Sequence, residues 1–162
     1  MLQQLATLNA QDVTFKGRTF SSSATAAPAV ALASQAWLWN DGGSGKRIWL
    51  TAYKAESLAA TFLFFGSGVV PPASLVPFAK SLYAGNQPAS TCARAGFDRT
   101  RGLFGSMFFL WDQLNNPSPV LEWTFLPAPI IIDPGRGFGV QPEAVNQDVS
   151  CAFMWYETAP AI

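Results

Sequence analysis

The stretch that decides the fold spans residues 130–157 and reads IIIDPGRGFGV (130–140), QPEAVNQD (141–148) and VSCAFMWYE (149–157). Two runs rich in β-branched, glycine and aromatic residues flank the turn Pro134-Gly135, and an aromatic run follows after a polar loop. Short runs of this kind, bounded by proline and glycine, are typical of strands. The stretch therefore predicts a tightly packed β-domain, and it carries no reactive group that would indicate what the domain does.

Similar runs continue along the rest of the chain. No helical periodicity exceeds ten residues, and segment 21–28 is small and polar and is interpreted as a loop. The spacing predicts an all-β fold, an antiparallel β-sandwich of about eight to ten short strands over 13–158. A short N-terminal arm or helix (1–12) and a C-terminal tail (159–162) flank it. The predicted strands are 13–20, 30–39, 46–53, 61–65, 90–98, 104–111, 120–126, 130–133, 137–141 and 149–157.

A hairpin is predicted where the sequence reads NDGGSG (40–45). Asp-Gly and Gly-Gly pairs supply the positive φ that hairpin turns need, so we expect an antiparallel hairpin across Trp39 to Lys46. The alternation in the second strand assigns side chains to two faces. One face takes Ile48, Leu50 and Ala52, and the other takes Arg47, Trp49, Thr51 and Tyr53.

A long connection is predicted between Val69 and Gln87. The sequence Gly66-Ser67-Gly68 is expected to end the preceding strand, and Pro71, Pro72 and Pro77 make regular sheet unfavourable. We expect a short helical turn around 73–79. Connections of this length are used in Greek-key topologies to cross from one sheet to the other.

The composition is unusually poor in charge. Charged residues make up 12% of the chain, about half of the typical share of roughly 25%, and the ten basic and ten acidic residues cancel. Such a surface favours coverage by neighbouring subunits, and the balanced charge argues against nucleic-acid binding. Arg94, Arg99 and Arg101 form a small cluster, interpreted as a loop or edge that meets Asp98 or a neighbouring subunit.

The sequence offers little catalytic or metal-binding chemistry. The absence of histidine removes the commonest general base and metal ligand. The glycine-rich segments 42–47 and 135–139 do not have the glycine spacing of phosphate-binding loops, and no helix is predicted after either of them. We therefore interpret the first as a hairpin turn and the second as a bend. The carboxylates are scattered and form no calcium-binding loop, and a glycosidase pair is disfavoured. We therefore expect no catalytic residue, no cofactor and no metal site.

Cys92 and Cys151 are isolated and occur in strand-like runs. We expect both to be small buried hydrophobes, with a disulfide between them as the less favoured alternative.

No apolar run approaches the ~20 residues that span a bilayer, and the N-terminus lacks the features of a signal peptide. We expect a protein made in the cytoplasm, with no membrane contact.

Trp37 and Trp39 share one face of a predicted strand, and Trp49 lies across the predicted hairpin. Such a face is typical of a core or a subunit interface, and the alternative is a stacking platform for carbohydrate.

The C-terminal pattern IIDPGRGFGV (131–140) followed by VSCAFMWYE (149–157) resembles small jelly-roll structural proteins of tailed bacteriophages. The resemblance implies a jelly-roll-like fold and a non-enzymatic virion protein. Such a protein is a head decoration (cement) protein or a minor structural subunit, often trimeric, that contacts the major capsid protein. The alternative is a carbohydrate- or receptor-binding module of a phage tail or fibre, and an enzyme is the third choice. The candidate interface residues are Leu2, Leu5, Leu8, Trp39, Trp49, Leu75, Phe78, Arg99 and Arg101.

Overall fold

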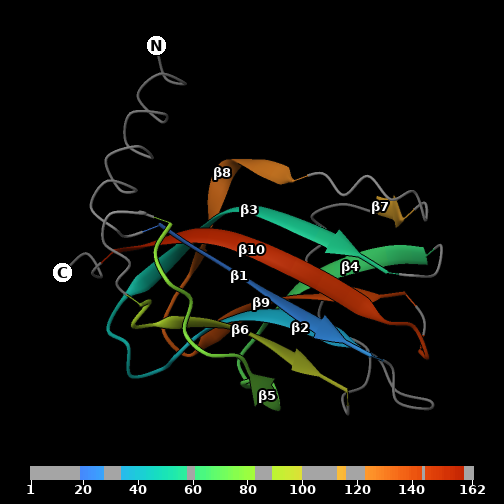
Figure 1. Ribbon diagram of the computed structural model, residues 1–162, viewed down its shortest axis with the longest axis horizontal. Coiled ribbons are helices and arrows are strands. Elements are labelled where there is room, and N and C mark those ends of the chain that lie inside the picture. Colours follow the sequence, from blue (N-terminus) through green and yellow to red (C-terminus); the bar gives the residue numbers. More distant parts are fainter. Residues whose placement is uncertain are drawn as a thin grey trace.

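The computed structural model describes residues 19–27, 34–57, 61–82, 89–99, 113–115, 123–143 and 145–158. Over these residues the protein is built from two antiparallel sheets (Figure 1). The four-stranded sheet has the order β1 (Thr19–Ala26), β10 (Val149–Thr158), β3 (Arg47–Glu56) and β8 (Thr124–Ile132). The six-stranded sheet has the order β5 (Ser74–Leu75), β6 (Ala93–Asp98), β2 (Gln35–Asn40), β9 (Arg136–Pro142), β4 (Thr61–Gly68) and β7 (Gln113–Asn115). The predicted all-β sandwich of eight to ten strands is confirmed.

The strand order is that of a jelly roll. If β5 and β6 are set aside, eight strands remain, four in each sheet. Consecutive strands change sheets at every step except from β4 to β7, and the first strand lies beside the last. This is the double Greek key of jelly rolls. Strands β5 and β6 are an insertion that widens one sheet beyond β2.

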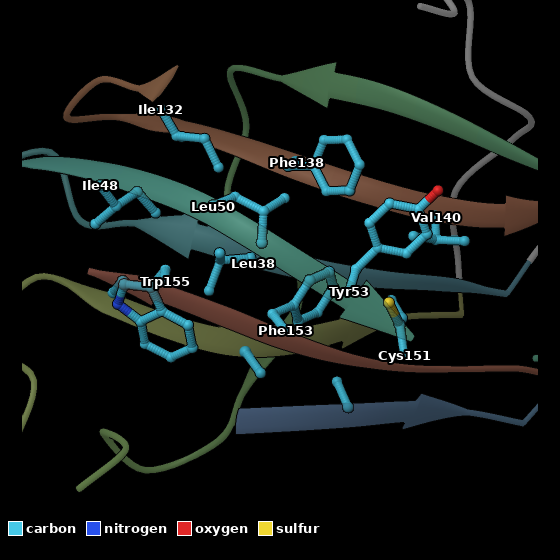
Figure 2. Close-up of a cluster of buried hydrophobic side chains, with 14 of the residues drawn as sticks. Leu38, Ile48, Leu50, Tyr53, Ile132, Phe138, Val140, Cys151, Phe153 and Trp155 are labelled. Atoms are coloured by element: carbon cyan, nitrogen blue, oxygen red, sulfur yellow. The ribbon is translucent and has the colours of Figure 1, made fainter. Parts of the chain in front are cut away.

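The core lies between the two sheets (Figure 2). Strand β10 alternates strictly, so every second side chain from Val149 to Glu157 is buried. Tyr53, Phe65 and Phe138 meet at its centre, with the Tyr53 and Phe65 rings 4.9 Å apart. Cys92 and Cys151 are both free and buried, so they occupy core positions as the sequence indicated.

The predicted hairpin from Trp39 to Lys46 is wrong. Strand β2 pairs with β6 and β9, whereas β3 belongs to the other sheet and pairs with β10 and β8. The glycine-rich turn instead carries the chain from one sheet to the other. The buried Asn40 amide fixes this crossing, because its Nδ2 donates to the carbonyls of Lys46 (2.9 Å) and Ile132 (3.0 Å) and its Oδ1 accepts from Ser44.

The predicted faces of β3 are correct only up to Leu50. The pairing of β3 with β8 shifts register between Leu50 and Ala52, and Tyr53 is 1% exposed in the core. A bulge of this kind turns the following side chains to the opposite face, which simple alternation does not anticipate. On the β8 side, Leu126–Pro129 stand opposite Thr51 alone. The two predicted strands 120–126 and 130–133 are therefore one bulged strand in the described part of the chain.

Segment 21–28 was expected to be a loop, and this is wrong for most of it. β1 pairs with β10 along its whole length, from Thr19 opposite Tyr156 to Ala26 opposite Val149. Ala24 and Ala26 are buried while Ser23 and Thr25 are exposed. Serine and alanine have weak strand propensity, and pairing with β10 overrides it.

The connection from β4 to β5 crosses the outer face of the six-stranded sheet. From Gly68 to Ser74 an extended chain reaches about 20 Å, and the four strand spacings from β4 to β5 require about 19 Å. Pro72 is buried, and its Cγ lies 2.7 Å from where a Cβ on Gly96 of β6 would be. This strap (69–73) therefore lies extended across the sheet. The predicted crossing between sheets and the predicted helical turn at 73–79 are both wrong, since β5 occupies 74–75 of the same sheet.

Glycines in β4 and β9 make room for Trp37. The indole is 2% exposed on the outer side of the sheet, and Cβ atoms on Gly68, Gly137 or Gly139 would come within 2.7–3.2 Å of its ring atoms. β4 accordingly continues through Gly68, whereas the sequence predicted that Gly66-Ser67-Gly68 would end the strand.

The predicted arm 1–12, tail 159–162 and strand 104–111 lie outside the described residues, as do 13–18 and 30–33 of two other predicted strands.

Gly139→Ala should destabilise the protein by about 1–3 kcal/mol, because the new methyl group overlaps the Trp37 indole. Urea denaturation at neutral pH measures this. Gly43→Ala is the matched control, since nothing lies within 4 Å of its Cβ position. An unchanged midpoint for Gly139→Ala would contradict the described packing of Trp37.

Candidate interaction surfaces

The structure separates the predicted interface residues. Trp39 is 4% exposed in β2, while Trp49 lies on the outer face of the other sheet, so the shared aromatic face expected from the hairpin does not exist. Leu75 is half-buried in β5, and Phe78 and Arg99 are exposed. The remaining predicted interface residues, Leu2, Leu5, Leu8 and Arg101, lie outside the described residues.

Trp49 forms a stacked pair with Tyr156 on the outer face of the four-stranded sheet. The ring centroids are 5.7 Å apart and the planes differ by 5°. The indole Nε1 donates to Thr158 Oγ1 at 2.8 Å, which fixes the ring orientation. Partial burial raises the pKa of Tyr156. Ile131 of β8 stands opposite Trp49 and is 48% exposed, so the apolar strip continues onto the sheet edge.

Strand β8 adds a second exposed apolar feature. Phe125 is 70% exposed, and Pro127, Ala128 and Pro129 are exposed in the bulge. The prolines donate no ladder hydrogen bonds, so this edge is closed to further strands while its side chains stay accessible. This surface was not predicted, because the sequence was interpreted as two separate strands, 120–126 and 130–133, with a break between them.

The connection 69–82 carries four of the large apolar residues that are exposed in the described part of the chain. They are Val69 (61%), Val70 (56%), Phe78 (38%) and Leu82 (46%). Arg94 covers one face of Phe78 at 4.8 Å from the ring centroid, and its Nη2 binds both carboxylate oxygens of Asp41 at 3.0–3.1 Å. Asp98, expected near the arginines, accepts a hydrogen bond from the Ala73 N–H. Arg99 lies over the Phe97 ring at 5.2 Å.

A buried polar cluster closes one end of the core. Glu157 is 5% exposed, accepts a short hydrogen bond from Ser90 and lies 3.5 Å from Lys46 Nζ. Ser90 Oγ also accepts the Ala93 N–H at 3.0 Å. The Ser90 side chain is itself buried, at 2% exposure. The cluster holds the turn before β6 against the end of β10.

Both cysteine thiols are held in their neutral form. Burial raises the pKa of Cys92, and the Glu157 carboxylate raises it further. Burial likewise raises the pKa of Cys151. Within the described residues, no group of three or more Cys, Asp or Glu side chains forms a metal-binding cluster. The same part of the chain contains no helix long and apolar enough to cross a membrane.

No protein-family model matches the chain, and no curated protein matches it significantly. What the structure establishes is the class, an all-β sandwich with the strand order of a jelly roll.

The free energy of unfolding should fall as the pH rises from 8 to 10. The buried thiols stay protonated in the folded protein while the unfolded thiols ionise near their ordinary pKa of 9.0, so stability present below that pH is lost above it. Each thiol contributes about 1 kcal/mol. Denaturant titrations of the wild type and of Cys92→Ala/Cys151→Ala test this, and an equal decline in both would contradict it.

Proposed function

We propose that the protein is a non-enzymatic structural subunit of a virus particle, a decoration or cement protein that stabilises a phage head through oligomeric apolar contacts. The observation that carries the proposal is the set of exposed apolar side chains on the connection 69–82. Charged residues make up only 12% of the chain, so there is little surface charge to oppose the association of such apolar side chains.

The fold is consistent with this role. Jelly rolls build viral capsid domains, and they also build lectins, so the fold alone decides nothing between them. In the proposed role the chain forms a homotrimer and binds the major capsid protein, which places it in the virion after synthesis in the host cytoplasm. Repetition of a small contact over a capsid multiplies weak binding into high avidity.

Light scattering coupled to size-exclusion chromatography should give the mass of a trimer at micromolar concentration. Val69→Asp should convert most of it to monomer, because it places a charge in an apolar contact without partners. Gly43→Asp adds the same charge at an open turn and should leave the mass unchanged.

A monomeric wild type would contradict the oligomeric role, and an equal effect of both substitutions would contradict the assigned surface. The virion assignment has its own readout. Purified particles of the virus that encodes the chain should contain it in a fixed ratio to the major capsid protein, and its absence from them would refute the assignment.

The second candidate function is carbohydrate or receptor binding at the stacked pair Trp49–Tyr156. Two parallel rings on an open sheet face, with the indole fixed by Thr158, are suited to stacking on a sugar.

On a glycan array, this second function predicts specific retention that Trp49→Ala abolishes. Phe125→Ala is the matched control, since it removes an exposed aromatic ring that lies on the edge strand β8. Retention that survives Trp49→Ala, or no retention by the wild type, would exclude this site.

A further inference from the structure

The edge of β1 is a long strand edge of the described structure without the charge, proline or bulge that usually protects one. Strand β8 is closed by Pro127, Pro129 and its bulge, and the edge strands β5 and β7 have two and three residues. β1 has eight residues, TFSSSATA, with no charge, no proline and no register shift against β10. Proteins ordinarily block such edges with lysine, proline or bulges, because unpaired backbone groups recruit another strand.

The direction of the free backbone groups follows from one hydrogen bond. The Leu82 N–H donates to the Thr19 carbonyl at 2.8 Å, on the side of β1 away from β10. Backbone groups of alternate residues in a strand point to the same side. Ser21, Ser23 and Thr25 therefore present their N–H and C=O groups to that side. Within the described residues, the chain covers this edge only at its start, where the antiparallel bridge between Phe20 and Ser81 places Lys80–Leu82 alongside Thr19–Ser21. Ser23 and Thr25 remain uncovered.

The side chains of β1 indicate what kind of strand fits. Specificity for a foreign peptide in strand addition comes from pockets for its alternate side chains. The residues whose backbone groups point to this edge have only the small side chains of Ser and Thr. The alternate residues Ala24 and Ala26 have their side chains buried in the core. The segment is also uncharged, so a second copy meets no like-charge repulsion. β1 is thus poorly suited to select a peptide of foreign sequence. It is well suited to pair with β1 of a second copy of the chain.

We propose that β1 pairs with β1 of a second copy of this chain, antiparallel and around a two-fold axis at Ala24. Ser23 then lies opposite Thr25 of the second copy. This register uses the two residues of the edge that segment 80–82 leaves uncovered. Cross-strand Ser and Thr hydroxyls form hydrogen bonds in such pairs, as Thr25 and Ser150 do within the chain at 2.8 Å.

The contact is small, below the roughly 1,200 Å² of stable specific interfaces, so it forms at high concentration or on a surface that holds many copies. It is independent of the proposed trimer contact. For a single pair of chains the isologous geometry closes on itself, so a monomer stops at two. A trimer doubles its mass when its three β1 edges pair with those of one second trimer.

Sedimentation velocity over a rising concentration series of the full chain tests the proposal. The wild type should double its mass, and Ser23→Pro should weaken this doubling on the order of 10- to 30-fold, since two backbone hydrogen bonds are lost per pair. The substitution leaves the ladder to β10 intact, because the Ser23 N–H points to the free edge. Ser23→Thr keeps the N–H and should double like the wild type.

Failure here is distinguishable from failure of the proposed function. Loss of the trimer in Val69→Asp with doubling retained would leave the β1 pairing standing. Equal doubling by the wild type and Ser23→Pro, or no doubling at any concentration, would overturn it. If Ser23→Pro does not fold, hydrogen exchange of the wild type decides: the amides of Ser23 and Thr25 should gain protection as the concentration rises, and concentration-independent exchange would overturn the proposal.

Discussion

The structure depends on the pairing of β10 with two strands from distant parts of the chain. On one side β10 holds β1 from Thr19 to Ala26, and on the other it holds β3 along its whole length. Its alternate side chains also line the core, where Cys151, Phe153 and Trp155 are at most 1% exposed. Without β10, the four-stranded sheet has no contact between its first strand and the rest. Such pairings join residues far apart in the chain, so they cost loop-closure entropy and are typical of slowly folding β-proteins.

The six-stranded sheet depends on a different constraint. Trp37 occupies its outer side over glycines of β4 and β9, and the strap 69–73 crosses that same side to reach β5. The strap leaves Val69 and Val70 exposed on the outside of the sheet. The apolar surface on which the proposed assembly role rests is therefore a consequence of the insertion of β5 and β6 into the eight-stranded fold.

Much of the architecture was predictable from the sequence, because burial of one face leaves a period of two in a strand such as β10. Three kinds of feature were not. The Asp41–Gly45 turn has the chemistry of a hairpin, and only the pairing partners of β2 and β3 show that it joins two sheets. β1 has the composition of a loop and becomes a strand by pairing with β10. The sequence also could not show whether Trp39 and Trp49 are buried or exposed. Trp39 lies on the outer side of its sheet and is buried there, and a sequence pattern does not show that other residues cover this side.

The most direct test of this account is removal of β10. A chain that ends at Asp148 lacks the strand that joins β1 to β3, and the account predicts no cooperative unfolding transition by circular dichroism in urea. The loss follows from the removal of the buried Phe153 and Trp155 together with both ladders. A truncated chain that still unfolds cooperatively, with a midpoint near that of the full chain, would contradict the central role given to β10.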